Sequence, residues 1–329
     1  MRKVFTLVII CLIAWVGANA ERVICGYVAQ SAPDSINPQW VNRLIYSYIE
    51  IDSTLTRVEV KNPPRLRYVA SLKEQNPNLE VMVSFGGMPG LVSRAMRNDS
   101  LRGNVVGQCK DIIDEYGLDG IDIDWEFPGR GEGALSEKED VANFVRLLSD
   151  LRASLGDGKI ITIACAGSGY GVDYTAMTPF VDQFNVMAYD MGVPPSHHSA
   201  LYKSEHVAWL TADQSVSNFL EGGVPPSKIV LGMPFYGRGG NAFEDFTQWK
   251  HITIPAGASE CYDSEAEVPW IADENGNMIF TYDNPYSLSK KCEYIREKNL
   301  AGGMYWRIEQ DDNTQILGRT VFEGLKDQK

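Results

Sequence analysis

Short runs of β-branched and aromatic residues alternate with longer stretches of helical period along almost the whole chain. This alternation is typical of βαβ units around a parallel sheet. Eight such runs are present, at residues 23–29, 44–51, 79–85, 120–127, 160–166, 183–189, 229–236 and 302–308. Eight alternations predict an α/β fold in the form of a (β/α)8 TIM barrel.

Helix start signals precede two of the apolar-periodic stretches. Ser136 with Glu139, and Thr211 with Gln214, each have the spacing of a capping box. The apolar positions within 141–151 then follow one helical face, which we expect to pack on the barrel. Two further helical segments, near 36–43 and 173–180, are short and weakly periodic.

The stretch 239–281 is longer than an ordinary connection between a strand and a helix. We therefore expect a modest insertion after the seventh strand. The chain contains no internal repeat, low-complexity segment or Pro/Ser-rich linker, so a second independent domain is not indicated. The predicted organisation is a signal peptide at 1–20 and one catalytic domain at 21–329.

The signal peptide is inferred from the N-terminal residues. Arg2 and Lys3 precede an apolar run at 4–17, and Ala18-Asn19-Ala20 resembles a cleavage site. The alternative is a membrane anchor, which needs about 20 apolar residues and so exceeds this run. The sequence predicts export, either secreted or periplasmic, and no membrane partner.

The net charge of the chain limits the class of partner. Without residues 1–20 the chain has 28 basic and 43 acidic side chains, a net charge of −15. Because such a surface repels phosphate polymers, we expect no nucleic-acid partner. We also expect a monomer.

Among the five remaining cysteines, four resemble buried small hydrophobes, namely Cys25, Cys109, Cys165 and Cys292, whereas Cys261 lies in a polar stretch.

The strongest chemical signal is the segment at 119–126, where four of eight residues are acids inside an apolar strand pattern. Since side chains alternate along a strand, Asp122, Asp124 and Glu126 point to one face and the intervening residues to the other. Three neighbouring carboxylates cannot all ionise cheaply, so at least one should have a raised pKa. Glu126, nearest the carboxyl end of the strand, is the candidate general acid.

Two structural alternatives compete with a catalytic role for this segment. A solvated acidic edge conflicts with the interleaved Ile123 and Trp125. A calcium loop counted from Asp122 has Phe127 in place of the sixth-position glycine and Gly133 in place of the twelfth-position glutamate.

The segment Asp119-Gly-Ile-Asp-Ile-Asp-Trp-Glu126 resembles the signature of family 18 glycoside hydrolases, the chitinase family, whose members are (β/α)8 barrels. Further segments resemble motifs of the family's third, sixth, seventh and eighth strands, in the right order. They are Ser84-Phe-Gly-Gly87, Met187-Ala-Tyr-Asp190, Tyr236-Gly-Arg238 and Gly302-Gly-Met-Tyr-Trp306.

This resemblance implies roles for individual residues. Glu126 would act as general acid and then base, Asp124 would orient the substrate's acetamido group, and Asp122 would share a proton network behind it. Tyr189 would hydrogen-bond the same acetamido group, and Trp306 would form the floor under the sugar. The residues expected to line the same pocket are Met187, Asp190, Tyr236 and Arg238.

The implied function is a secreted retaining glycosidase that hydrolyses β-1,4 bonds of N-acetylglucosamine polymers or oligomers by substrate-assisted catalysis. That chemistry needs no metal and no cofactor. The alternatives are an endo-β-N-acetylglucosaminidase acting on peptidoglycan or N-glycan cores, and a non-catalytic sugar-binding lectin on the same barrel.

The chain also departs from the family's pattern. Met88 stands where many processive chitinases carry a tryptophan, and residues 191–195 contain no aromatic side chain. We therefore expect few stacking platforms and a shallow, open groove. His197, His198 and His206 lie in a polar loop without the helical spacing of a zinc site.

Overall fold

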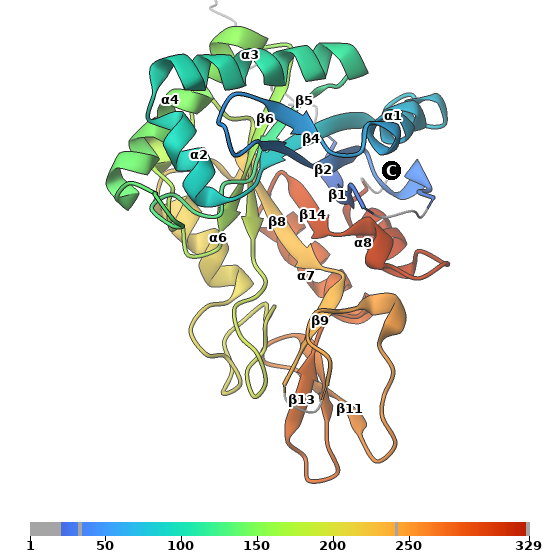
Figure 1. Cartoon of the computed structure of the whole chain (residues 1–329). Helices are drawn as coiled ribbons and strands as arrows, with labels where there is room; N and C mark the ends of the chain where they lie inside the picture. The colour runs from blue at the N-terminus through green and yellow to red at the C-terminus, as the bar shows by residue number, and fades with distance from the viewer. Residues whose placement is uncertain (1–20, 32–34, 241–242, 327–329) are drawn as a thin grey trace, which may run out of the picture.

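The computed structural model describes residues 21–31, 35–240 and 243–326. Eight parallel strands form a barrel in the order β1-β14-β8-β7-β6-β5-β4-β2, closed by the pairing of β1 with β2 (Figure 1). These strands are β1 (Val23–Ala29), β2 (Arg43–Ile51), β4 (Glu80–Gly86), β5 (Gly120–Ile123), β6 (Ile160–Ala166), β7 (Gln183–Met187), β8 (Ile229–Pro234) and β14 (Gly302–Trp306). The predicted (β/α)8 barrel is confirmed. The predicted signal peptide lies outside the described residues.

Helices surround the barrel. They are α1 (Pro63–Ser71), α2 (Pro89–Met96), α3 (Asp99–Tyr116), α4 (Glu137–Leu155), α5 (Tyr174–Met177), α6 (Ala212–Glu221), α7 (Pro285–Glu297) and α8 (Ile316–Leu325). Short 3-10 turns are η1 (Pro38–Trp40), η2 (Leu72–Glu74), η3 (Pro226–Lys228), η4 (Trp249–His251) and η5 (Ile308–Gln310). The two weakly periodic segments therefore form only the turn η1 and the single helical turn α5, because neither carries enough apolar positions to cover a strand.

Both predicted helix starts are confirmed, but only the first forms both hydrogen bonds of a capping box. At α4, Ser136 Oγ accepts the Glu139 N–H at 3.4 Å and the Glu139 carboxylate accepts the Ser136 N–H at 3.2 Å. At α6, Thr211 accepts the Gln214 N–H at 3.0 Å, but the Gln214 side chain donates to Asn218 instead of completing the box.

The apolar core of the barrel has two parts. The larger fills the space between the strands and the helices. A smaller cluster fills the barrel interior and comprises Cys25, Tyr27, Ile45, Met82, Val230 and Met304. Cys25, Cys109, Cys165 and Cys292 are buried and Cys261 is partly exposed, and all five are free thiols.

The insertion after β8 forms an antiparallel sheet of its own, in the order β10-β9-β13-β12-β11. Its strands are β9 (Tyr236–Gly239), β10 (Thr247–Gln248), β11 (Ser259–Asp263), β12 (Val268–Ala272) and β13 (Met278–Thr281). A short strand β3 (Val58–Val60) pairs with β2 elsewhere. The insertion projects from the barrel beside the long β7–α6 loop (Figure 1), to which it is joined by the Leu201 N–H and the Ala266 carbonyl at 2.9 Å.

Within the described ranges, no helix is long and apolar enough to cross a membrane.

Candidate active site

The strand β5 places its carboxylates at the barrel mouth. Its first residue must be glycine, because a Cβ on Gly120 would lie 2.1 Å from the Ile160 carbonyl oxygen of β6. Ile123 and Trp125 belong to the outer core, where the Trp125 ring lies 5.5 Å from that of Phe144 on α4. The intervening acids therefore point inward, as the alternation predicts.

Asp122 lies deepest and is fully buried. Its Oδ1 accepts hydrogen bonds from Thr162 at 2.6 Å and Asn185 at 3.2 Å. Its Oδ2 accepts hydrogen bonds from Ser84 at 2.8 Å and Tyr27 at 3.1 Å. Burial still raises the pKa of Asp122, although these four donors oppose the rise. Ser84, to which the sequence assigned no role, is thus one of its four donors.

Asp124 is also buried, at 6% exposure. The Tyr48 hydroxyl hydrogen-bonds to it, whereas its Oδ1 has no partner among the described residues. Burial and then the charges of Glu126 and Asp122 hold the pKa of Asp124 well above its usual range. Asp124 therefore retains a proton at pH values where an ordinary aspartate has lost it.

Glu126 lies beyond the end of β5 and is exposed to solvent in the open site. Neighbouring atoms nevertheless displace enough water from its carboxyl to raise its pKa, and the negative charge of Asp190 raises it further. Glu126 thus has the property required of a general acid, a proton held to higher pH than in an ordinary glutamate.

One cavity, of about 230 Å³, has both Asp124 and Glu126 in its wall. Trp306, at the end of β14, lies across it, with the Tyr48 ring stacked at 6.0 Å and 19° and the Tyr27 ring at 5.8 Å. The remaining lining residues are Ala164, Met187, Tyr189, Asp190, Tyr236, Phe246 and Gln310. Two of the predicted site residues do not line this cavity. Asp122 lies behind it, and Arg238 contacts its lining residue Asp190.

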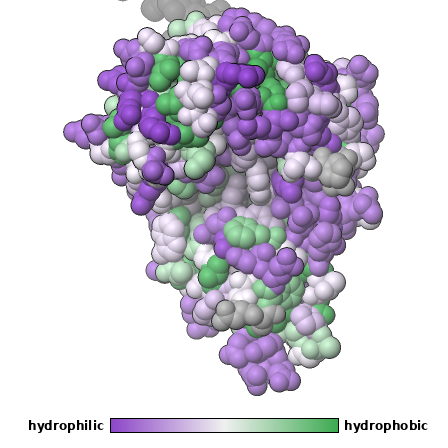
Figure 2. Space-filling model, viewed as in Figure 1, coloured by the Kyte–Doolittle hydropathy of each residue, from purple (hydrophilic) through white to green (hydrophobic). Residues whose placement is uncertain are grey.

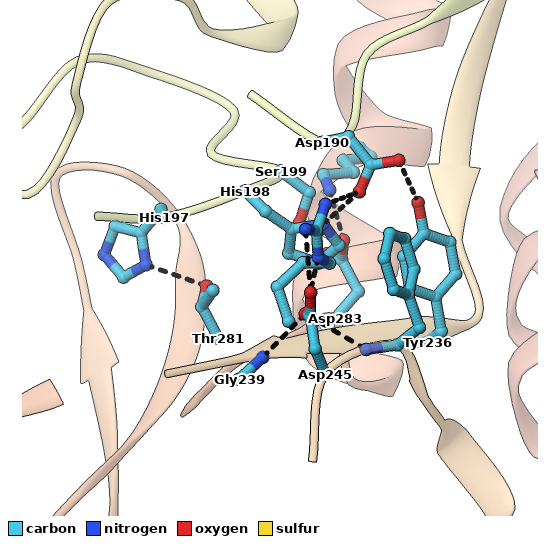
Figure 3. A network of polar contacts seen from close by, with 12 residues as sticks. Asp190, His197, His198, Ser199, Tyr236, Gly239, Asp245, Thr281 and Asp283 are labelled. Carbon is cyan, nitrogen blue, oxygen red and sulfur yellow. Dashed lines mark hydrogen bonds and ion pairs between the residues drawn. The ribbon is translucent and has the colours of Figure 1, made fainter. Parts of the chain in front are cut away.

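Asp190 follows β7 and is fixed by two residues of β9 (Figure 3). Its Oδ1 accepts a hydrogen bond from Arg238 at 2.6 Å, and its Oδ2 accepts one from the Tyr236 hydroxyl at 2.8 Å. Burial opposes ionisation of Asp190, but the neighbouring His198, Arg238 and Tyr236 outweigh it and lower its pKa to about 2. Asp190 is therefore a permanent anion beside Glu126.

Two histidines lie beneath this network, although the sequence placed them in a polar loop. His197 and His198 are 1% and 0% exposed. His197 Nε2 lies 3.1 Å from Asp263 Oδ2, and His198 Nδ1 lies 3.8 Å from Asp190 Oδ1. Burial lowers the pKa of both rings, that of His197 to about 4. In the described part of the chain, no three His, Cys, Asp or Glu side chains are arranged to hold a metal ion.

A second cavity, of about 430 Å³, meets the first at Glu126, Met187, Tyr189 and Asp190. Its other lining residues are Phe127, Arg130, Ala166, Gly167, Ser168, Tyr170, Met191, Trp209 and Leu210. The space-filling view shows the molecule hollowed between the barrel and the inserted sheet (Figure 2).

This second cavity corrects the expectation of few aromatic platforms. Trp209, 65% exposed, comes from the far end of the β7–α6 loop, and Tyr170 comes from the loop after β6. No sequence motif pointed to Trp209 or Tyr170, because both residues lie outside the family motifs and only the fold brings them to one cavity. Tyr48 could have been found, since it lies near the carboxyl end of a predicted barrel strand.

Comparison with known proteins agrees with this geometry. A family model described as "Glycosyl hydrolases family 18" matches residues 23–311. Chitinase A1 of Niallia circulans is 31% identical over 302 residues, 75% of this chain and 43% of that protein. Endochitinase 1 of Metarhizium robertsii is 29% identical, covering 73% of this chain and 63% of that protein. The chain thus spans less than two thirds of either relative.

A solved structure also superimposes closely. The crystal structure of the Ostrinia furnacalis Group IV chitinase matches with a TM-score of 0.83 and 25% identity, covering 93% of this chain and 100% of that chain. Since the family model spans nearly the whole barrel and the acids of β5 lie at its mouth, this chain belongs to glycosyl hydrolases family 18.

Proposed function

We propose that this chain is an exported retaining glycosidase that hydrolyses β-1,4 bonds of N-acetylglucosamine oligomers or polymers, with residues 21–329 as its catalytic domain. The observation that carries the proposal is the position of Glu126 where two cavities meet, with the buried Asp124 in only one of them. The three relatives named above are chitinases, which supports N-acetylglucosamine as the sugar.

The two cavities would hold the two sides of the bond that breaks. The sugar that keeps its anomeric carbon would occupy the smaller cavity, on the face of Trp306, because aromatic faces pack on sugar C–H groups. Its acetamido group would reach Asp124 and Tyr189. The leaving group would occupy the larger cavity, beyond Glu126, and Asp190 with Tyr236 and Arg238 would hold the wall between them.

The acetamido oxygen of the substrate would act as the nucleophile. Asp124 is a poor candidate for that role, because burial and the neighbouring carboxylates raise its pKa and the Tyr48 hydroxyl hydrogen-bonds to its carboxyl group. Glu126 would protonate the glycosidic oxygen while the acetamido oxygen attacks the anomeric carbon and the C–O bond breaks. Glu126 would then take a proton from the water that opens the oxazolinium ion, with net retention.

Product analysis tests this function. The chain without residues 1–20 is incubated with N-acetylglucosamine oligomers, peptidoglycan and a glycoprotein, and products are identified by mass spectrometry. We expect cleavage of the oligomers, with the β-anomer appearing first by proton NMR. Binding without cleavage would indicate a lectin. An α-anomer as first product would mean direct attack by water and would reject the roles of Asp124 and Tyr189.

A further inference from the structure

We propose that Arg130 gives the leaving-group cavity a preference for sugars that carry a carboxylate. The inference rests on the proposed function, because that function assigns the larger cavity to the leaving group. It concerns a residue outside the segments that identified the family.

Arg130 is held in place at the wall of the larger cavity. Its backbone N–H donates to the Phe127 carbonyl at 3.0 Å, closing the turn that follows Glu126. Its guanidinium lies 5.1 Å from the centre of the Tyr170 ring. That ring is fixed in turn, because its hydroxyl donates to the Pro128 carbonyl at 3.1 Å and the Phe127 ring meets it edge-on at 6.1 Å.

The guanidinium of Arg130 is available to a ligand. It is exposed, and within the described ranges it forms no ion pair with any carboxylate, in contrast to Arg238, whose guanidinium binds both Asp190 and Asp245. The contact with the aromatic face restricts the arginine side chain, and its guanidinium still attracts anions.

The two acids in the wall of the same cavity do not cancel this attraction. The charge of Asp190 is partly offset by the hydrogen-bonded Arg238, which also binds Asp245. Glu126 must be protonated, and therefore neutral, at the moment it acts as an acid. A carboxylate on the leaving group would thus meet in Arg130 a cation that no carboxylate of the described residues pairs with.

The fitting ligand is an amino sugar with a carboxylate within reach of the guanidinium. The planar fork of arginine binds a carboxylate through two parallel hydrogen bonds, while the exposed face of Trp209 offers a platform for the sugar ring. Two sources share this chemistry: a reducing-end aldonate, and a lactyl ether such as that in bacterial wall glycan.

The test compares two pentamers of N-acetylglucosamine. In one the reducing end is oxidised to the aldonate, and in the other it is reduced to the alditol, so both end in an open chain and differ only at C1, which is a carboxylate or a hydroxymethyl group. We expect the wild type to show a kcat/KM about threefold to tenfold higher for the aldonate, the range of one charge-assisted contact at a partly exposed site. Raising the ionic strength from about 20 mM to about 0.5 M should reduce this ratio.

Variants identify the residue responsible. Arg130→Gln should bring the ratio to about one while leaving the alditol rate within about twofold, and Arg130→Lys should retain part of the preference. The matched control is Arg67→Gln. Arg67 lies 5.2 Å from the Tyr116 ring, forms an exposed ion pair with Glu115 at 3.6 Å, and borders neither cavity. It should leave the ratio unchanged.

Each outcome has one meaning. A wild-type ratio of one or less, or a ratio that Arg130→Gln does not lower, would overturn the inference and leave the proposed function intact. If neither pentamer is hydrolysed, the proposed function fails, and the affinity of both pentamers by calorimetry still decides the preference. A disaccharide repeat of wall glycan with its lactyl carboxylate free or methylated then distinguishes the two sources.

Discussion

Glu126→Gln is the substitution that tests the chemistry most directly. Glutamine keeps the shape of the side chain but cannot release and recover a proton, and general acid–base catalysis contributes about 10²- to 10⁴-fold to rates. That loss raises the activation barrier by about 2.7 to 5.5 kcal/mol. Hydrolysis should therefore collapse by this factor.

The structure also predicts that the substitution leaves the fold intact. Among the described residues, none donates a hydrogen bond to the Glu126 side chain. Glutamine at this position therefore leaves no buried hydrogen-bonding group without a partner. The pKa of Glu126 is raised in the folded chain, so the folded state loses stability as the pH rises from the unfolded-state pKa, and the full loss is present above the folded-state pKa. The melting temperature at neutral pH should be unchanged or slightly higher.

Initial rates on an N-acetylglucosamine tetramer, followed by chromatography, measure the loss of hydrolysis. Calorimetric titration with the same oligomer measures binding. The matched control is Glu132→Gln, which changes an exposed glutamate of the same β5–α4 loop and should retain full activity. A Glu126→Gln enzyme that keeps more than about a tenth of wild-type turnover would remove Glu126 from the role of acid, given the magnitude above.

Three further outcomes are expected. Asp190→Asn removes a negative charge that raises the pKa of Glu126, so the alkaline limb of the pH–rate profile should move to lower pH; an unmoved limb contradicts this coupling. Trp209→Ala should raise KM about fivefold for oligomers extended on the leaving-group side, with an unchanged melting temperature because the ring is 65% exposed. Lys291→Met breaks an ion pair buried at 0% exposure on both sides and should cost about 3–5 kcal/mol in urea unfolding. Lys290→Met, on the surface beside it, should cost under about 0.5 kcal/mol.

The sequence by itself determined the barrel and the inward row of acids. Both depend on local periodicity, since strand runs alternate with helices and side chains alternate along each strand. Asp122 and Asp124 therefore lie where the pattern places them. The strand itself is shorter than predicted, ending at Ile123, because the chain leaves the sheet at the barrel mouth before Glu126.

The tertiary structure decided the surroundings of those acids. Whether His198 is exposed or buried depends on the inserted sheet that packs over its loop, and the partners of Asp190 come from a strand 46 and 48 residues further along. Trp209 and Arg130 border one cavity although they belong to different loops. Contacts between distant segments leave no periodic signal in the sequence, so the acids were predictable from a single strand, whereas the cavities, charge pairs and aromatic faces around them required the closed barrel.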